Sequence, residues 1–452
     1  MATTTTGSRL PPGPRGHWFR GCLGDVQKRP LEFYRECQQQ YGDFVRVPFF
    51  AGIQMYLLAH PDAIEHVLQK HHKNYRKPDF FPKLVGLLAG NGLFTSEGDF
   101  WLRQRRLMQP AFHRQHLERL VPAMTAAADA FVADHLRRPN ETFDILPEMM
   151  KLSLRIAGNT LFSTDISADA DEVGRAFRTA FEYVGYRMNF DPWTPLWWPN
   201  QRNREFKEAK RVLDRLVLRI IADRRRSENR PDDLLTLLLQ AQDEDSGRGM
   251  TDQQLLDEVL TLLLAGHETV GASLAWTWGL LGDHRDIQEQ AFDEIHAVLR
   301  GRTPTLADLP QLPLTRAIYD ETLRLYPPAW GQPREAIAED EIGGYTIPKK
   351  SVIMVSQWLV QRDERYWRRP HDFVPERFLT PDPQRPKFAY FPFGGGPRIC
   401  IGQAFALMEA PLVMATILQR FRIIRATAGE IIPDPTFTLR PKHGVPIRLE
   451  PR

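Results

Sequence analysis

The feature that most constrains this chain is a long apolar segment that begins at Thr251 and ends near Gly282. Thr251 and Gln254 have the spacing of a capping box, and the residues after them keep a helical period. A helix of about 30 residues would rise roughly 45 Å, enough to cross a whole domain. Its centre, residues 259–265, is apolar on nearly every face, which is typical of a helix buried in a large core. The sequence therefore predicts a long core helix.

The rest of the chain predicts a mainly α fold. Helical periodicity dominates from residue 61 to about residue 301, including single helices expected over 62–70 and 117–137. Extended segments are expected at 43–59, as a hairpin turning near Gly52, and at 342–347, 351–357 and 437–449. We expect an α+β fold with a minor β region built from both ends of the sequence. A polar, proline-rich leader, residues 1–16, would precede one domain over 17–452.

Composition and charge argue against a nucleic-acid partner, a disulfide framework and a membrane-spanning segment. A formal net charge of +3 over 452 residues is too small a bias to predict a nucleic-acid partner. Cys22, Cys37 and Cys400 are odd in number and widely spaced, which argues against disulfides and for a reducing compartment. We see neither a signal peptide nor an uninterrupted apolar run of transmembrane length. These observations predict a cytoplasmic protein without a transmembrane anchor.

Polar residues interrupt the centre of the long helix. Gly266, His267, Glu268 and Thr269 directly follow its most apolar stretch. A buried carboxylate is costly unless it is paired or used, so Glu268 is a candidate for proton transfer. The Thr269 hydroxyl could instead bond back to its own helix. We expect His267 to be an ordinary residue, neither ligand nor base.

A glycine-rich segment ends at the third cysteine. Gly394, Gly395 and Gly396 permit unusual backbone angles and close approach of the main chain to a bound group. A free thiol, with a pKa of about 8.5, must lose its proton to bind a metal, and nearby backbone N–H groups and a helix N-terminus favour that loss. Cys400 is therefore a candidate metal ligand. The alternative is a buried free cysteine at the start of a helix.

The segment resembles the haem-binding loop FxxGxRxCxG of the cytochrome P-450 superfamily at Phe393, Gly396, Arg398, Cys400 and Gly402. The resemblance covers nearly the whole chain and is to the soluble, mostly bacterial members. It implies haem b held between the long central helix and the cysteine-bearing loop. Cys400 would be the axial ligand of the iron.

Other motifs follow in the family's chain order. Glu321 and Arg324 resemble the ExxR pair, and Arg377 the arginine that completes a structural triad, although such a pair alone is usually a weak surface interaction. Arginines suit the haem propionates because guanidinium keeps its charge. The resemblance implies cofactor contacts by Trp101, Arg105, Arg334, Phe393, Gly394, Arg398, Gly402 and Ala265. Gln361 stands where many relatives carry histidine, which puts one local contact beside the haem in doubt.

Residues 265–269 resemble the family's oxygen-binding stretch, (A/G)Gx(D/E)T. The resemblance implies catalytic roles for Glu268 and Thr269, which would relay protons while the thiolate of Cys400 favours O–O cleavage. The expected activity is monooxygenation: one atom of O₂ enters a hydrophobic substrate such as a fatty acid or terpenoid. The alternatives are a haem-thiolate peroxygenase or isomerase that acts on peroxides, and a non-catalytic haem sensor.

The length leaves no room for a fused reductase, so we expect electrons from a separate protein. A ferredoxin with its NAD(P)H-dependent reductase, or a flavodoxin-type donor, would supply them to a monomeric enzyme. Arg103 and Arg106 are candidate docking charges.

The substrate is left open by the sequence. Candidate contacts, which could equally be plain core, are Phe80, Leu84, Leu87, Ala265, Ala329, Trp330 and Phe437. Trp193, Trp197 and Trp198 lie in a proline-broken loop and predict either a lid over the substrate channel or a peripheral contact with lipid.

Overall fold

The computed structural model describes residues 9–49, 52–164, 170–228, 231, 233–242, 247 and 249–452. Contacts divide the chain into two units. The first unit consists of the described parts of Met1–Asp79, Ala329–Asp372 and Asp382–Cys400, and the second of those of Phe80–Pro328, Phe373–Pro381 and Ile401–Arg452. Residues 1–8 of the predicted leader lie outside the described residues. The single domain expected over 17–452 stays a prediction.

The first unit contains a five-stranded sheet in the order β1-β2-β8-β5-β3. Its strands are β1 (Phe44–Pro48), β2 (Gln54–Leu58), β3 (Tyr75–Arg76), β5 (Gln332–Ala336) and β8 (Val352–Val355). β1 and β2 are antiparallel, which confirms the predicted hairpin, and β8 is parallel to β2. The predicted segment 342–347 is itself part of a hairpin of β6 (Asp340–Ile342) and β7 (Tyr345–Ile347).

Alternating burial explains how this sheet packs. Val45 and Val47 of β1 are buried while their neighbours are half-buried, and β2 is buried from Met55 to Leu58. The helices of this unit are α1 (Leu23–Lys28), α2 (Pro30–Tyr41), α3 (Pro61–Glu65) and α15 (Gln357–Val360).

The prediction of one helix over 62–70 was wrong in one respect. α3 ends at Glu65, and a π-helical turn, η2 (His66–Lys70), follows. The backbone N–H of His71 donates to the carbonyl of His66 at 2.8 Å, five residues back, so the turn is wider than an α-helical one.

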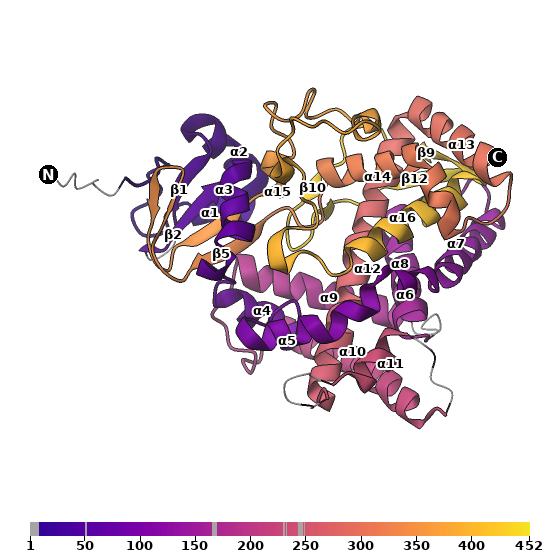
Figure 1. The fold of residues 1–452 in the computed structure, drawn as a ribbon, viewed down its shortest axis with the longest axis horizontal. Coiled ribbons are helices and arrows are strands. Elements are labelled where there is room, and N and C mark those ends of the chain that lie inside the picture. Colours follow the sequence, from indigo (N-terminus) through magenta and orange to yellow (C-terminus); the bar gives the residue numbers. More distant parts are fainter. Residues whose placement is uncertain are drawn as a thin grey trace, which may run out of the picture. The chain divides into compact units, whose positions relative to one another are not determined.

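The second unit is mostly helical (Figure 1). Its helices are α4 (Phe80–Ala89), α5 (Gly98–Met108), α6 (Arg114–Glu118), α7 (Val121–Leu136), α8 (Ile145–Leu161), α9 (Ala170–Asn189), α10 (Gln201–Arg226), α11 (Leu234–Gln240), α12 (Asp252–Asp283), α13 (Arg285–Leu299), α14 (Pro313–Leu325) and α16 (Gln403–Leu418). The helix expected over 117–137 is two helices, α6 and α7. The break follows from Pro122, because its ring clashes with the carbonyl four residues earlier, that of Glu118.

The predicted core helix is α12, and it runs the full expected length. The capping box of Thr251 and Gln254 is formed, which confirms that prediction. α12 packs along α8 and also touches α10, α14 and α4. Of the described helices it alone is long and apolar enough to cross a membrane, and 83% of its apolar window is buried inside the protein. That burial is what a core helix shows.

The second unit has its own small sheets. β4 (Thr142–Asp144), β12 (Pro446–Pro451) and β9 (Phe421–Arg425) form one, in the order β4-β12-β9, and β10 (Pro433–Asp434) pairs with β11 (Arg440–Pro441). The C-terminal strands therefore do not join the N-terminal sheet. The prediction of one minor β region built from both ends of the sequence was wrong in this respect. Leu449 of β12 instead pairs with Ile423 of β9, and both are buried. The predicted α+β class is confirmed.

Candidate functional site

Cys400 differs from the other two cysteines in accessibility. Cys22 and Cys37 are buried, and burial raises the pKa of both thiols, that of Cys37 to about 12. Cys400 is exposed, so the alternative of a buried free cysteine is wrong for this residue. A metal ligand must be both reachable and able to lose its proton. Exposure leaves Cys400 the most suitable thiol of the three.

The loop that carries Cys400 is folded tightly. The N–H of Cys400 donates to the carbonyl of Phe393 at 2.9 Å, which closes the loop. Gly394 and Gly396 have φ of 74° and 65°, in the left-handed region that glycine favours. A Cβ on Gly396 would lie only 1.8 Å from the carbonyl oxygen of Leu68. The glycines are therefore required for the loop to approach the backbone this closely.

Gln361, the departure from the family pattern, supports the same loop. Its side chain is buried, and its Oε1 accepts the backbone N–H of Phe391 at 3.1 Å. The carbonyl of Phe391 in turn accepts the N–H of Gly394 at 2.9 Å. Glutamine thus holds the entry to the loop through a contact that the sequence did not predict. The only sign of this contact in the sequence was the departure from the family pattern at Gln361.

The first unit also carries two of the predicted propionate ligands. Arg334, in β5, is half-buried and donates to the carbonyl of Pro333 at 2.9 Å and to Gln332 at 3.4 Å. Arg398 is half-buried in the cysteine loop. The side chain of Gln332 would be 3.1 Å from a Cβ on Gly394, so β5 and the loop are neighbours. One accessible thiol and two guanidinium groups fit an iron porphyrin, which needs an iron ligand and partners for two carboxylates.

In the second unit, α12 is continuous, but its burial is interrupted at the predicted oxygen-binding stretch. Between Leu255 and Leu281 every residue is buried except Ala265, Gly266 and Thr269. These three residues lie within about one helical turn, so the break in burial is confined to that stretch. The Thr269 hydroxyl donates to the carbonyl of Ala265 at 2.7 Å, so the bond back to its own helix is formed.

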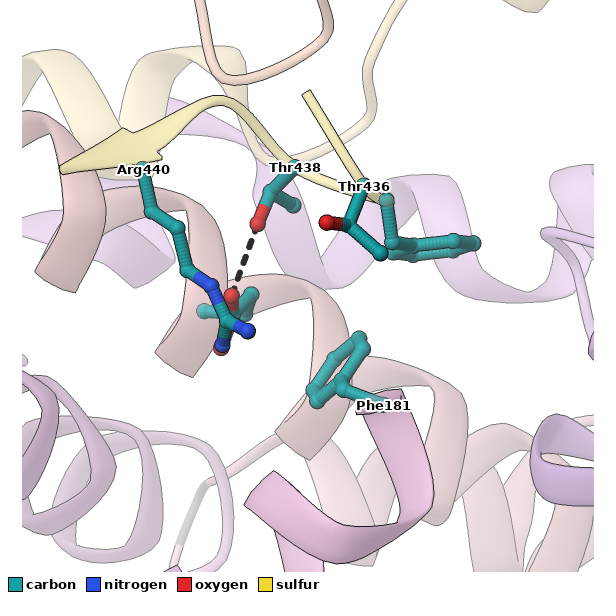
Figure 2. A pocket seen from close by; sticks show the side chains of 6 residues that line it. Phe181, Thr436, Thr438 and Arg440 are labelled. Atoms are coloured by element: carbon teal, nitrogen blue, oxygen red, sulfur yellow. Dashed lines mark hydrogen bonds between the residues drawn. The ribbon is translucent and has the colours of Figure 1, made fainter. Parts of the chain in front are cut away.

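Glu268 is buried but not unpartnered. Its Oε1 accepts the hydroxyl of Thr438 at 2.7 Å, a bond marked by the dashed line in Figure 2. Burial raises the pKa of Glu268, and this outweighs the hydrogen bond from Thr438 and the charges of Arg440 and Arg178, which lower it. A carboxyl group with a raised pKa holds a proton more firmly than an exposed one. Thr438, 170 residues away in sequence, was not predicted, and no motif marks it.

A small cavity of about 10 Å³ adjoins Glu268 (Figure 2). This volume is at the lower limit of what one water molecule needs. Phe437, predicted as a substrate contact, lines the cavity together with Phe181 and Arg440. The structure therefore brings one predicted substrate residue close to the predicted proton-transfer residue.

His267 is a buried neutral residue. Burial lowers its pKa to about 4, and its ring lies 5.1 Å from that of Phe177. The ring therefore packs in the core as an uncharged group, and its lack of a catalytic or ligand role stays a prediction.

Glu321, Arg324 and Arg377 meet inside the second unit. Arg324 donates to both carboxylate oxygens of Glu321, from Nε at 2.7 Å and from Nη2 at 2.8 Å, and both residues are fully buried. Arg377 donates to Oε1 of Glu321 at 3.1 Å, and the N–H of Val374 does so at 2.9 Å. This bidentate, buried arrangement differs from the weak surface pair that the spacing alone allows. It joins α14 to the segment around Val374.

Trp101 and Arg105 both lie on α5 and are half-buried. Their i,i+4 spacing puts them on one face of the helix. Of the candidate docking charges, Arg106 is exposed and Arg103 half-buried.

The remaining substrate candidates are divided between the units. Within the second unit Phe80 is exposed, Leu87 half-buried and Leu84 buried. In the first unit Ala329 is exposed, and Trp330 packs against the core with its ring 6.2 Å from that of Tyr34.

A row of aromatic rings connects the start of α4 to Phe437. Ring centroids lie 5.4 Å apart for Phe81 and Phe94, 6.4 Å for Phe94 and Phe437, and 5.5 Å for Phe437 and Phe181. Phe94, in the turn between α4 and α5, and Phe181, in α9, were not predicted, because a single phenylalanine gives no signal beyond core. The row gives the second unit an apolar surface beside Glu268.

The three tryptophans of the proline-broken loop are exposed, Trp193 by 66%, Trp197 by 72% and Trp198 by 53%. Buried side chains fix the backbone of the loop. Arg187 donates to the carbonyl of Asp191, and Asn203 donates to the carbonyl of Trp198 at 2.9 Å. The indoles are therefore presented outward from an anchored loop.

Comparison with known proteins bears on the whole chain. The sequence model of the family described as cytochrome P450 matches residues 11–446. The chain is 36% identical over 434 residues to cyclooctat-9-en-7-ol 5-monooxygenase of Streptomyces melanosporofaciens, covering 94% of this chain and 92% of the relative. It is 34% identical over 435 residues to pentalenene oxygenase of Streptomyces avermitilis, covering 96% and 95%. The solved structure described as retinoic acid-bound cyanobacterial CYP120A1 is similar with a TM-score of 0.87, at 26% identity, covering 99% and 100%.

The helix-rich α+β fold is that of the solved cytochrome P450 structures it resembles. The chain belongs to the cytochrome P450 family. It is an oxidoreductase, a monooxygenase that uses haem and O₂, and it depends on a redox partner and acts on a hydrophobic substrate.

Proposed function

We propose that this chain oxidises a terpenoid, using electrons that a ferredoxin delivers one at a time. Two relatives at 34–36% identity are named for oxygenation of cyclooctat-9-en-7-ol and pentalenene. The aromatic row from Phe81 to Phe437 supplies apolar contacts suited to a hydrocarbon skeleton. The observation that carries the use of O₂ is the buried Glu268, held by Thr438 and followed directly by Thr269.

Cys400 would hold the haem iron through its thiolate, because it is the exposed thiol and lies on a loop that glycines fold tightly. Arg398, Arg334, Trp101 and Arg105 are proposed to bind the propionates. When bound, the haem supplies the activation of O₂ that no amino-acid side chain can perform. The protein supplies the thiolate, the orientation and the protons.

Glu268 and Thr269 are proposed to manage protons. Thr438 fixes Oε1 of Glu268, which leaves Oε2 to exchange a proton with water. Thr269 donates to the carbonyl of Ala265, and its oxygen keeps lone pairs that can accept a hydrogen bond. A carboxyl group whose pKa is raised by burial can give up a proton during the reaction and regain it from solvent.

The redox partner is proposed to be a small ferredoxin with an NAD(P)H-dependent reductase, and a flavodoxin-type donor is an alternative source. Arg103 and Arg106 on α5 are proposed docking charges, which would suit a partner with an acidic surface. We also propose a monomer in the cytoplasm, where Cys22 and Cys37 remain free thiols.

The test is reconstitution of the purified protein with ferredoxin, reductase and a panel of cyclic terpenes. Terpenes that bind are first found by the absorbance shift caused by displacing water from the iron. We expect NADPH consumption to rise on addition of a binding terpene and a hydroxylated product to form. Product formed from hydrogen peroxide alone, with none from NADPH, would instead favour the peroxygenase. Binding without any product would favour a sensor.

The role of Thr269 is tested in the same assay. Thr269→Ala removes the hydroxyl but keeps the helix, so we expect more hydrogen peroxide and less product per NADPH consumed. Thr261→Ala is the matched control, because Thr261 lies on the same helix and its hydroxyl donates to Ala89, away from the accessible stretch. Equal coupling in the two variants would contradict the assignment.

A further inference from the structure

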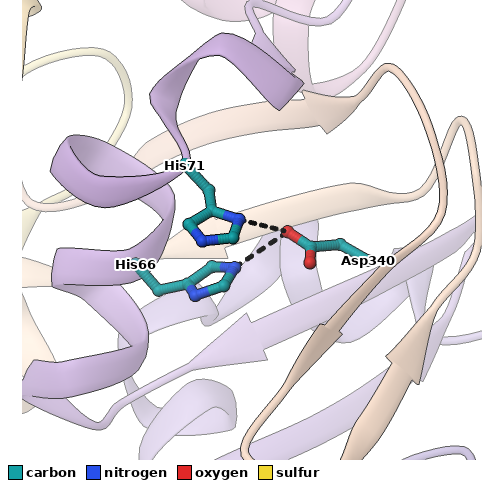
Figure 3. A group of neighbouring side chains, drawn as sticks. All are labelled: His66, His71 and Asp340. Carbon is teal, nitrogen blue, oxygen red and sulfur yellow. Dashed lines mark hydrogen bonds and ion pairs between the residues drawn. The ribbon is translucent and has the colours of Figure 1, made fainter.

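A cluster of histidines and a carboxylate lies in the first unit, among residues that the haem chemistry does not use. Nε2 of His66 is 2.8 Å from Oδ2 of Asp340, and Nδ1 of His71 is 3.8 Å from the same oxygen. Figure 3 shows both rings turned toward this carboxylate. The two rings stack with centroids 3.9 Å apart at 23°.

The π-helical turn η2 brings the two histidines together. In an α-helix, side chains five residues apart point about 140° away from each other. In η2 the N–H of His71 donates to the carbonyl of His66, and the wider turn places both imidazoles on one side. π-helical turns are rare and occur frequently at functional sites. The local backbone is therefore shaped so that His66 and His71 act as a pair.

The donor atoms have the separation that a tetrahedral ion requires. Two ligand atoms each about 2.0–2.1 Å from zinc lie about 3.3 Å apart at the tetrahedral angle. The distances of 2.8 and 3.8 Å from Asp340 bracket this value, and all three donor atoms lie within 4.8 Å of one another. Small side-chain rotations would equalise the two distances.

Further hydrogen bonds orient the carboxylate of Asp340. The phenol of Tyr75 donates to Oδ2 at 2.7 Å, and the N–H of Glu341 donates to Oδ1 at 2.8 Å. Metal ligands commonly have such outer partners, which fix their direction.

The cluster is open to solvent on one side. The side chain of His71 is 55% exposed, whereas those of His66 and Asp340 are 20% and 13% exposed. An ion can therefore enter past His71 and keep one coordination position for water.

We propose that His66, His71 and Asp340 form a binding site for a divalent transition-metal ion, with zinc as the best fit. Nε2 of His66, Nδ1 of His71 and Oδ2 of Asp340 are the protein ligands, and water or an external donor takes the fourth position. Two imidazoles and one carboxylate form a ligand set that suits zinc and its neighbours and gives poor affinity for calcium or magnesium. The ion would fasten η2 to β6.

The test is isothermal titration calorimetry, in which zinc is titrated into the tag-free, haem-loaded protein. We expect saturable binding of one ion per chain, reversed by a chelator. His71→Ala should lower the affinity by more than about 100-fold, and Asp340→Asn, which keeps the size of the side chain, should do the same. Tyr75→Phe should cost about 10-fold, since it removes only an outer partner. His72→Ala is the matched control, because His72 is adjacent in sequence but its Nδ1 donates to the backbone carbonyl of Gln69 at 2.9 Å.

No saturable binding, or binding that His71→Ala leaves unchanged, would overturn the proposal and leave an ordinary hydrogen-bonded His–Asp pair. The haem absorbance and circular dichroism of each variant serve as checks on folding. Because the readout is zinc affinity, its outcome is independent of the substrate and of Glu268.

Discussion

Replacing Glu321 by glutamine should destabilise the protein strongly, although the two side chains have nearly the same size. Glu321 is fully buried and accepts hydrogen bonds from Arg324, Arg377 and the N–H of Val374. Glutamine removes the negative charge between two guanidinium groups and turns an NH₂ donor toward other donors. Removing one partner of a buried ion pair costs about 3–5 kcal/mol. We expect a loss of that size in the free energy of unfolding.

The matched control is Asp134→Asn on α7. Arg137 and Asp134 have the same i,i+3 spacing and lie 3.0 Å apart, but their side chains are 75% and 61% exposed. Exposed pairs contribute about 0–1 kcal/mol, so this variant should unfold almost like the parent protein.

The assay is urea unfolding of the haem-loaded variants, followed by far-ultraviolet circular dichroism and by haem absorbance. The parent and both variants are compared at equal protein concentration, because bound haem adds to apparent stability. Glu321→Gln should unfold at much lower urea and lose haem with the helical signal. A Glu321→Gln variant within about 1 kcal/mol of the parent, at unchanged slope, would refute the structural role of the triad.

Three further outcomes are expected. Burial raises the pKa of Glu409 well above its ordinary value, and its carboxyl oxygens have no hydrogen-bond partner among the described residues. The folded state thus keeps a proton that the unfolded chain loses above about pH 4, so the free energy of unfolding falls as pH rises. Glu409→Gln removes this titration and should therefore raise the urea midpoint at neutral pH but not near about pH 4. Thr438→Val removes the donor that lowers the pKa of Glu268, so any inflection due to Glu268 in the pH profile of kcat should move to higher pH; an unchanged profile would contradict this role. Gln361→Leu leaves the buried N–H of Phe391 without its acceptor and should cost about 1–3 kcal/mol in urea unfolding, and a change under about 0.5 kcal/mol would contradict that contact.

Local signals made much of the fold predictable. The capping box at Thr251 and the apolar run after it give α12 to within about one residue of its observed ends, because both depend only on neighbours in sequence. Pro122 was an available signal for the break between α6 and α7, and it outweighs the apolar period that spans both helices. The hairpin around Gly52 was predictable for the same local reasons.

Long-range pairing was not predictable in the same way. β12 pairs with β9 and β4 rather than with the N-terminal sheet, and no property of a single strand fixes its partner. In the π-helical turn at His66 a backbone hydrogen bond spans five residues in place of four. The residue composition of the turn is that of an ordinary helix, so the sequence does not distinguish the two. Thr438 reaches Glu268 across 170 residues, so only the folded chain brings them together. Candidate site residues could be proposed from sequence where their spacing is short, but not where they depend on contacts such as that of Thr438.

Ligation of iron by Cys400 is the central claim, and the absorbance of the reduced protein with carbon monoxide tests it most directly. A thiolate ligand shifts the Soret band strongly to the red of the band that histidine ligation gives. We expect the red-shifted band in the parent protein and in Cys37→Ser, and its loss in Cys400→Ser. A histidine-like band in the folded parent protein, or a red-shifted band that survives in Cys400→Ser, would contradict the account.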